Sequence, residues 1–186
     1  GAYTNSTAVT STTAGAGNTA TALLNVRASL TAIGLTKQVG LSSDLNGTWN
    51  SNLTVGAGTP VYYKFTIENV GDTSLTLANN TVVDSTLATA LGGAVSCTWY
   101  KFSALGSPVT YVTTTTLPAA SGGDPIAYCV AGPVSFASAQ TVTNTATATT
   151  GGASASDSSV LTVLANPTIS NAFTVSDLAS GGSTNL

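Results

Sequence analysis

The sequence contains very few charged side chains. Of its 186 residues, 4 are Lys or Arg and 7 are Asp or Glu, so the net charge is −3 and charged residues make up 6% of the chain. Soluble domains usually carry about 25%. No basic cluster is available to neutralise a phosphate backbone, which argues against a nucleic-acid-binding role. Thr, Ser, Ala and Gly occupy the places that charged residues usually take.

The chain also lacks the residues on which most catalytic and metal sites depend. It has no His, and it contains neither a GxSxG motif nor a DxDxDG calcium loop. Its acids are scattered, and Asp72 and Asp124 fall in predicted turns, where a solvated carboxylate is the simpler interpretation. We therefore expect no enzyme, no metal site and no cofactor.

Long apolar runs and methionine are missing as well. The longest apolar runs fall far short of the ~20 residues that a membrane helix needs, so no span is expected within this chain. Because no Met is present, we expect either a processed chain or an excerpt from a longer one.

Only two cysteines occur, Cys97 and Cys129. An even number of cysteines in a Thr/Ser-rich chain of secreted character favours a disulfide between them, and two buried free thiols are the alternative. Closing a loop of this length would stabilise the fold by about 3–4 kcal/mol in the chain-entropy model.

The residues from 61 to 87 show the clearest strand pattern. Val61, Tyr63, Phe65 and Ile67 alternate with the polar or amphipathic side chains of residues 62–68. This period of two predicts a strand with one buried and one solvated side. A polar turn at 69–72, a strand through Leu75 and Leu77 and a third strand over 82–84 are expected to follow.

The remaining apolar segments also predict strands. No apolar stripe with a 3.6-residue period persists for three turns, so essentially no helix is expected. Two short strands in residues 1–33 are expected to be joined by a turn at Ala14–Asn18. Further strands are expected at 35–39 (LTKQV), 94–102 (AVSCTWYKF), 111–117 (YVTTTTL), 126–132 (IAYCVAG), 141–149 (TVTNTATAT) and 158–164 (SSVLTVL).

The start of the chain resembles its final hairpin. YTNSTAVT at 3–10 is similar to VTNTATAT at 142–149, with Asn5 aligned to Asn144, and Leu24 then aligns with Leu161. Such internal similarity indicates repeated folding units, although Thr/Ala-rich strands can also look alike by chance.

This repeat predicts three parts of the chain. Residues 1–33 would be the terminal hairpin of a preceding repeat or a donor-strand segment, residues 34–165 a complete β-sandwich, and residues 166–186 the opening strand of a following repeat or a linker. A fainter similarity between 35–39 and 169–173 places Asn171 at the position of Lys37.

Several motifs together resemble a known family. They are LTKQV, VYYKFTIENVGD, TVVDSTL, CTW, AYC and TNTATAT, and they cover roughly residues 34–165. The pattern is similar to the repeat domain of unknown function found in tandem in bacterial and archaeal cell-surface proteins. The resemblance implies an all-β, Ig-like or Greek-key β-sandwich with flanking strands from adjacent repeats or donated between subunits. About eight short strands with frequent turns independently argue for a sandwich.

Two polar side chains are predicted to point into this sandwich. Lys37 lies between Leu35 and Val39, and Asn144 has the inward phase of its strand, so each needs a buried partner. Surface-fibre domains similar to this one often join such a pair by an isopeptide bond, assisted by a buried acid, and burial favours the uncharged amine that attacks. Asp84 is the expected acid.

Two alternatives to this bond stay open. Lys37 could extend its amine to solvent while Asn144 bonds to the backbone. Glu68 is a weaker candidate for the acid, because its phase points outward with Lys64.

Four N-glycosylation sequons occur, at Asn5, Asn46, Asn52 and Asn79. The three in predicted loops are favoured over Asn5, which shares the inward phase of Asn144. Attached glycans would help to keep a surface with so few charges soluble.

These features lead to one main functional hypothesis. The chain is expected to be a structural subunit of an extracellular, pilus-like filament or cell-surface appendage, which polymerises with other copies of itself by β-strand complementation. The first alternative is a tandem stalk module of a cell-surface adhesin or S-layer protein. The second is a sugar-binding module that uses the aromatic side chains of Trp49, Trp99, Tyr62 and Tyr100.

Overall fold

The computed structural model describes residues 2–13, 15–102, 107–110 and 115–167. Within these residues the protein is all-β apart from one short helix. Two larger sheets and two pairs of strands are present, and all strand pairings but one are antiparallel. The architecture is therefore that of an all-β protein, consistent with a β-sandwich.

The first large sheet has five strands in the order β3–β5–β11–β8–β9. β5 is its second strand, which pairs with β3 on one side and with β11, the central strand, on the other. The inward side chains predicted for β5, Val61, Tyr63, Phe65 and Ile67, are all buried, which confirms the alternating pattern. The strands are β3 (Ile33–Gly40), β5 (Val61–Asn69), β8 (Tyr100–Phe102), β9 (Pro108–Thr110) and β11 (Ile126–Val134).

The second large sheet has four strands in the order β4–β13–β12–β7. β12 and β13 form a long hairpin, as predicted, while β4 runs parallel to β13. The strands are β4 (Asn52–Gly56), β7 (Val82–Val83), β12 (Gln140–Thr150) and β13 (Ala153–Leu164), and a small separate pair consists of β6 (Leu75–Leu77) and β10 (Thr115–Leu117).

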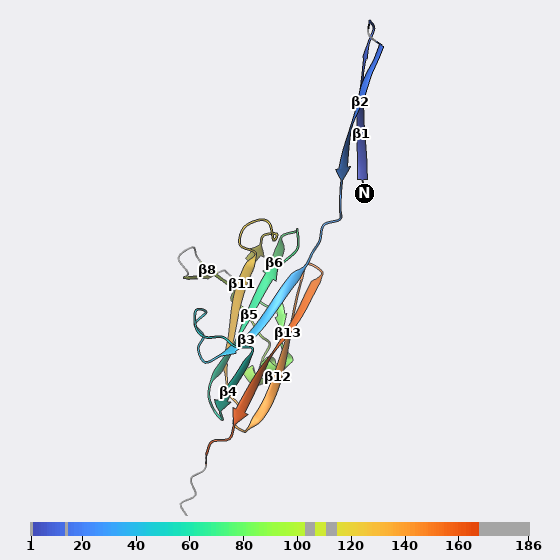
Figure 1. Cartoon of the computed structure of the whole chain (residues 1–186). Helices are drawn as coiled ribbons and strands as arrows, with labels where there is room; N and C mark the ends of the chain where they lie inside the picture. The colour runs from blue at the N-terminus through green and yellow to red at the C-terminus, as the bar shows by residue number, and fades with distance from the viewer. Residues whose placement is uncertain (1, 14, 103–106, 111–114, 168–186) are drawn as a thin grey trace, which may run out of the picture.

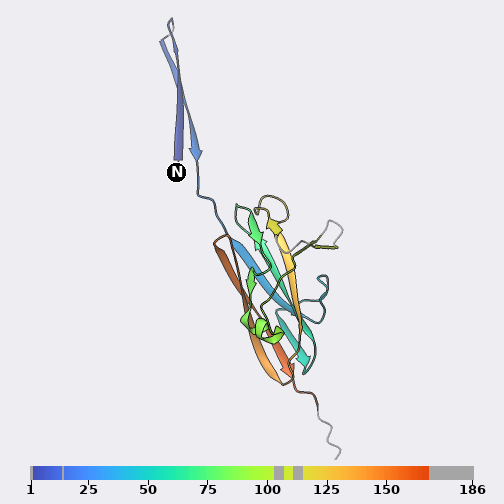
Figure 2. The ribbon, with the colours of Figure 1, turned by 180° about the vertical axis from the view of Figure 1, so that it is seen from behind.

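The hydrophobic core lies between these sheets. Side chains of β5 and β11 from the first sheet and of β12 and β13 from the second belong to one buried cluster, together with Leu77, Leu87 and Trp99. The two sheets overlap in both views of the ribbon (Figures 1 and 2). Polar residues that enter this space are consequently shielded from water.

The N-terminal residues form a separate hairpin of β1 (Ala2–Ser11) and β2 (Gly15–Asn25). It confirms the expected pair of strands, although β2 begins at Gly15, inside the segment predicted as the turn. The hairpin extends away from the two large sheets (Figures 1 and 2). Its described side chains are exposed to solvent.

The connection between this hairpin and β3 is attached to the turn after β5. The backbone of Asp72 donates to the Leu30 carbonyl (2.9 Å), and Val70 donates to the Ala32 carbonyl (3.1 Å). Arg27 also pairs with the Asp72 carboxylate at 2.9 Å. Gly71 allows this close approach, because a Cβ there would overlap the Leu30 carbonyl oxygen.

Two expectations about secondary structure were wrong. The expectation of essentially no helix was wrong, because a short helix, α1 (Ser85–Leu91), follows β7. The Asp84 side chain caps its start by accepting a hydrogen bond from the Leu87 amide, and Gly92 ends it in the left-handed conformation. Since Asp84 is this cap, β7 covers only Val82 and Val83. The strand predicted over 94–102 is formed only from Tyr100 onward.

Some expectations concern residues outside the described part of the chain. These are the middle of the predicted strand at 111–117, and Asn171 with most of the predicted opening strand at 166–186.

Candidate functional site

The side chain of Lys37 is enclosed between the two large sheets. It has 0% exposure, and its Nζ donates a hydrogen bond of 2.6 Å to Oδ2 of Asp84, which is also buried. The amine lies 5.0 Å from the centre of the Tyr63 ring and 5.8 Å from that of Phe65. The alternative in which Lys37 reaches solvent is therefore wrong.

Asp84 is held in this position from two sides. It directly follows β7, whose Val83 pairs with Thr147 of β12, so Asp84 lies beside the inner side of the second sheet. Its Oδ1 accepts from the Leu87 amide (2.8 Å), and its Oδ2 accepts from Lys37. The same carboxylate therefore caps α1 and pairs with the buried amine.

Two effects act in opposite directions on the pKa of Lys37. Burial lowers this pKa from its ordinary value of 10.5, while the hydrogen bond and charge of Asp84 and the charge of Asp157 raise it, and burial has the larger effect. Asp157 lies on β13 and accepts a hydrogen bond of 2.7 Å from the Lys37 backbone amide. The net result is an amine that loses its proton more readily than an exposed lysine.

The side chain of Asn144 lies in the same interior. Its side chain is 1% exposed, and neither its amide nitrogen nor its amide oxygen has a hydrogen-bond partner among the described residues. The hydroxyl of Ser159, directly opposite on β13, is also buried and unpaired there. Unpaired buried polar groups cost about 1–3 kcal/mol each and are rare in native proteins.

The phenol hydroxyl of Tyr63 is a third buried polar group. It makes no hydrogen bond of standard geometry within the described part of the chain. Burial raises the pKa of this phenol above 10.0; the nearby Asn144 amide opposes this shift, and the charge of Asp84 adds to it. Tyr63 therefore stays protonated at neutral pH, and its hydroxyl lies near the Asn144 amide.

The cluster of Lys37, Tyr63, Asp84 and Asn144 draws on both large sheets. Lys37 and Tyr63 come from the adjacent strands β3 and β5, where Lys37 pairs with Phe65 and Val39 pairs with Tyr63. Asn144 belongs to β12 and Asp84 follows β7. The structure thus brings Lys37 and Asp84 into contact and places Asn144 in the same core, while Glu68 is exposed on the outer side of β5.

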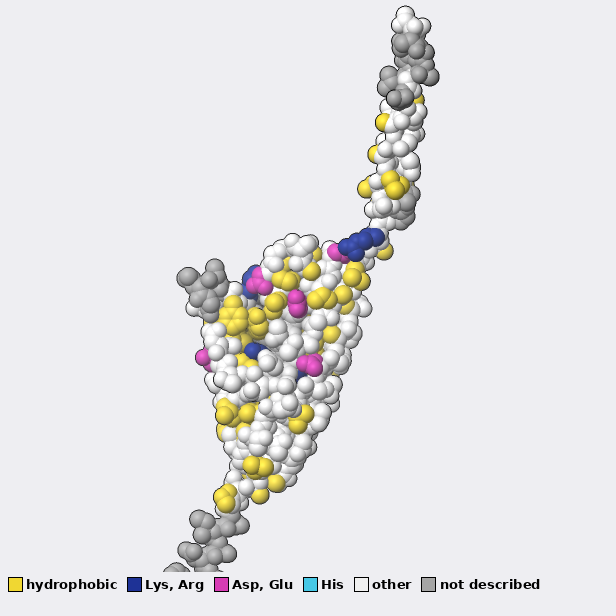
Figure 3. Space-filling model, viewed as in Figure 1, with side chains coloured by type: hydrophobic (Ala, Val, Ile, Leu, Met, Phe, Trp, Pro, Cys, Tyr) yellow, Lys and Arg dark blue, Asp and Glu magenta, His cyan; other side chains and the backbone are white. Residues whose placement is uncertain are grey.

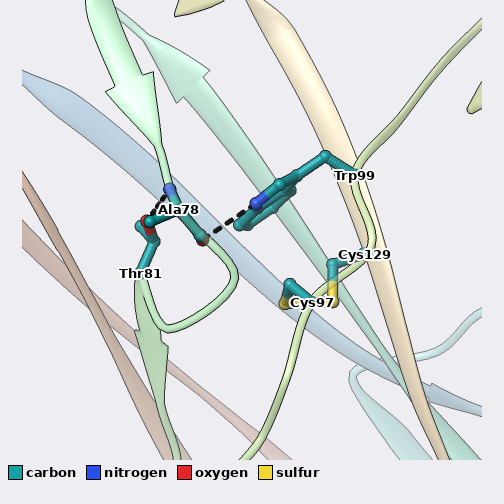
Figure 4. The surroundings of a disulfide bond; sticks show 5 residues. All are labelled: Ala78, Thr81, Cys97, Trp99 and Cys129. Atoms are coloured by element: carbon teal, nitrogen blue, oxygen red, sulfur yellow. Dashed lines mark hydrogen bonds between the residues drawn. A yellow bond between two sulfur atoms is a disulfide. The ribbon is translucent and has the colours of Figure 1, made fainter. Parts of the chain in front are cut away.

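The predicted disulfide between Cys97 and Cys129 is present, with a Cα–Cα distance of 5.5 Å (Figure 4). It ties the segment before β8 to β11. Beside it, Nε1 of the buried Trp99 donates to the Ala78 carbonyl at 3.0 Å. A disulfide is mildly consistent with an oxidising, extracellular location.

The predicted glycosylation positions Asn5, Asn46, Asn52 and Asn79 all lie at exposed positions. Asn5 shares the strand phase of the buried Asn144, but its side chain is exposed because the hairpin β1–β2 extends away from the two sheets. All four sequons therefore remain candidates for glycans.

The acids predicted to lie in turns have ordinary structural contacts. Asp72 pairs with Arg27, and Asp124 caps the start of β11 and lies 3.4 Å from Lys101. Among the described residues, no group of three acids or cysteines is arranged to hold a metal ion. No helix in this part of the chain has the length and apolar character to cross a membrane.

The aromatic residues considered for sugar binding do not form one exposed surface. Trp99 is fully buried, so it is unavailable to a ligand. Trp49 is half-buried, with the Lys64 amine 5.1 Å from its ring centre. The sugar-binding alternative therefore loses one of its four residues.

Sequence reasoning missed Tyr63 and Asp157 as members of this site. Tyr63 was predicted to lie on the buried side of its strand. A hydroxyl on that side needs a polar partner, and this need could have indicated that Tyr63 belongs to the site. Asp157 could not be found in this way, because its contact depends on β3 lying beside β13.

The fold and this cluster define an all-β protein with one disulfide and a buried lysine–carboxylate pair. No protein-family model matches the chain, and no curated protein matches it at a significant level. The resemblance to the tandem surface-protein domain therefore stays an expectation based on its motifs.

Proposed function

We propose that this protein is a structural subunit of an extracellular filament or surface appendage, in which the hairpin β1–β2 of one copy packs against another copy. The proposal includes an Ig-like, Greek-key arrangement of the sandwich and no enzymatic role. The observation that carries it is the relationship between two hairpins of the chain, β1–β2 and β12–β13.

From Tyr3 to Ala8 the first hairpin has the same strand register as the second; after the bulge between Ala8 and Thr10 the two registers differ by one residue. Tyr3 pairs with Leu24 in the first, and the aligned residues Val142 and Leu161 pair in the second. Asn5 likewise pairs with Ala22, as Asn144 pairs with Ser159. Over residues 3–8 the similarity in sequence is therefore matched in the strand pairing, which supports a repeated folding unit over chance resemblance.

The two hairpins differ in burial. Leu161 of β13 is 1% exposed, because β12–β13 covers the core, whereas its counterpart Leu24 is 63% exposed. Hydrophobic side chains are visible along the hairpin in Figure 3. Burying a leucine contributes about 1.5–3 kcal/mol, and an isolated two-stranded hairpin is at best marginally stable in water. A hairpin of this kind gains stability by docking, and a second copy of this chain is the partner proposed here.

Other features support an extracellular setting. The disulfide fits an oxidising compartment, and exposed sequons offer positions for glycans. Charged side chains are few and scattered on the face seen in Figure 3, so glycans would add to the solubility of the surface.

A stalk module of an adhesin or S-layer protein is the second candidate. It is favoured by the core between residues 33 and 163, which includes side chains of both large sheets and, where the side chains of the hairpin are described, none of β1 or β2. Such a module would hold the hairpin within a neighbouring domain of the same protein rather than another copy.

Hydrogen–deuterium exchange of the full chain at increasing concentration tests the proposal. Amides of β1 and β2 should exchange more slowly as the concentration rises, while those of β5 stay unchanged as an internal control. Electron microscopy of the concentrated sample should show filaments. Hairpin exchange that does not depend on concentration up to the solubility limit would contradict the proposal and favour the stalk module.

A further inference from the structure

We propose that Lys37 and Asn144 become joined by an amide bond within the folded chain, with Asp84 carrying the proton and Tyr63 donating a hydrogen bond to the reacting carbonyl. This inference is independent of the filament proposal. It assigns a chemical role to four buried side chains that otherwise form an incomplete polar network.

The buried amine of Lys37 has a direct route to its nucleophilic form. Lys37 is fully buried, and its only hydrogen-bond partner for Nζ among the described residues is Asp84, at 2.6 Å. A proton can therefore pass directly from Nζ to Oδ2 of Asp84. The neutral amine that results is the nucleophilic form of lysine, and the enclosure of this site lowers the pKa of Lys37 in the same direction.

Asn144 lies one inward-facing position along β12 from the residue beside Asp84. Val83 pairs with Thr147, so Asp84 continues alongside Ala146, which is the next inward-facing residue from Asn144 on β12. Inward-facing neighbours on a strand are about 7 Å apart. The carboxyl group thus lies within side-chain reach of the Asn144 amide and can carry a proton to it.

Lys37 lies beside the same hairpin, β12–β13. The Lys37 backbone amide bonds to Asp157 of β13, and Asp157 is paired with Ala146 of β12. Asn144 and Ser159 form the next inward-facing pair of that hairpin. β3 therefore runs along the hairpin at the level of the unpaired amide.

Tyr63 completes the arrangement. The amine of Lys37 lies 5.0 Å from the Tyr63 ring centre, and the Tyr63 hydroxyl is near Asn144. When the amine attacks, negative charge develops on Oδ1 of Asn144, and a buried hydroxyl donor stabilises such a charge. Tyr63 has no other hydrogen-bond partner among the described residues, so its hydroxyl is free to do so.

The steps balance as follows. Asp84 takes a proton from the Lys37 ammonium, and Nζ attacks Cγ of Asn144, forming a C–N bond. Asp84 then protonates Nδ2, the Cγ–Nδ2 bond breaks and ammonia leaves. Nζ gives one proton to Asp84, which passes it on to the departing ammonia as ammonium. No redox change occurs, and Asp84 is regenerated as a carboxylate.

The bond would connect β3, the first strand of the two-sheet body, to β12, close to its end. A pulling force applied across residues 33–164 would then pass through this bond instead of unfolding the chain between the two side chains. The bond would also remove the unpaired amide nitrogen of Asn144 from the core and turn its side-chain amide into a cross-link.

Intact-mass measurement of the denatured, reduced chain tests the inference. The wild-type mass should be lower than the sequence mass by one ammonia, and a proteolytic digest should contain a branched peptide that joins the segments around Lys37 and Asn144. Asn144→Ala and Asp84→Asn should have their full sequence masses. A folded wild-type protein with its full sequence mass would overturn the proposal.

A matched pair of variants tests the role of Tyr63. Tyr63→Phe removes only an unpaired hydroxyl, so the fold should persist, and the adjacent half-buried Tyr62, whose side chain lies on the other side of β5, supplies the control Tyr62→Phe. When intact mass is followed from the time of synthesis, loss of ammonia should be about 100-fold slower in Tyr63→Phe and unchanged in Tyr62→Phe. Equal rates in both variants would remove Tyr63 from the mechanism.

Discussion

Nζ of Lys37 lies 2.6 Å from Oδ2 of Asp84, and neither side chain is exposed to solvent. Removing one member of such a pair leaves an uncompensated buried charge, which typically costs about 3–5 kcal/mol. The stability of the protein should therefore depend strongly on Asp84 even when no covalent bond is present.

This dependence can be measured in an Asn144→Ala background, where Lys37 stays a free amine. Adding Asp84→Asn keeps a side chain that can cap α1 but removes the negative charge. We expect the free energy of unfolding, from urea titration at pH 7, to fall by about 3–5 kcal/mol. Asp124→Asn is the control, because the Asp124–Lys101 pair is partly exposed to solvent and should contribute less than about 1 kcal/mol.

The loss caused by Asp84→Asn should also depend on pH. Burial already lowers the pKa of Lys37 below 10.5, and removing Asp84 removes a group that raises this pKa. In the folded variant Lys37 therefore loses its proton at a lower pH than in the unfolded chain. The penalty should be larger at pH 7 than near pH 10.5, where the unfolded chain also loses this proton. A penalty that is constant from pH 7 to the unfolded pKa would contradict this account.

Gly71 provides a separate test of how the hairpin is attached. In Gly71→Ala the new methyl group would overlap the Leu30 carbonyl oxygen and lie 2.8 Å from the Ala32 nitrogen. We expect a loss of about 1–3 kcal/mol in thermal or urea unfolding. Gly93→Ala is the matched control, since nothing lies within 4 Å of its Cβ position, and it should leave stability nearly unchanged.

The disulfide should contribute substantially to stability. Cys97 and Cys129 are 32 residues apart in the sequence and both are buried. In the chain-entropy model, replacing both by Ala should lower the free energy of unfolding by about 3–4 kcal/mol. Denaturant titration of the oxidised protein and the variant would measure this, and equal midpoints would show that the loop closure has no such effect.

Much of the fold could be predicted because its strands alternate so regularly. The inward phase of Phe65 and its neighbours, and the inward phases of Lys37 and Asn144, follow from the two-residue period of a strand. Helix α1 was missed because seven residues are too short to show a helical stripe. Its end signals, Asp84 and Gly92, were nevertheless present in the sequence.

The candidate site could be predicted only in part. Strand phase says that Lys37 points inward, but it does not say which strand lies opposite. That Asp84 meets Lys37 depends on β7 pairing with β12, and that Asp157 reaches the Lys37 backbone depends on β13 lying beside β3. Contacts between residues this far apart in sequence arise from tertiary packing, which periodicity does not encode.

The most direct test of the filament proposal compares two adjacent leucines of β2. Leu23 and Leu24 are 64% and 63% exposed, so serine at either position should leave the fold intact, but only Leu24 corresponds to the buried Leu161. Sedimentation velocity of the full chain should show assemblies for wild type and Leu23→Ser and monomers for Leu24→Ser. Equal assembly of the two variants, or a wild type that stays monomeric at every concentration, would contradict the proposal.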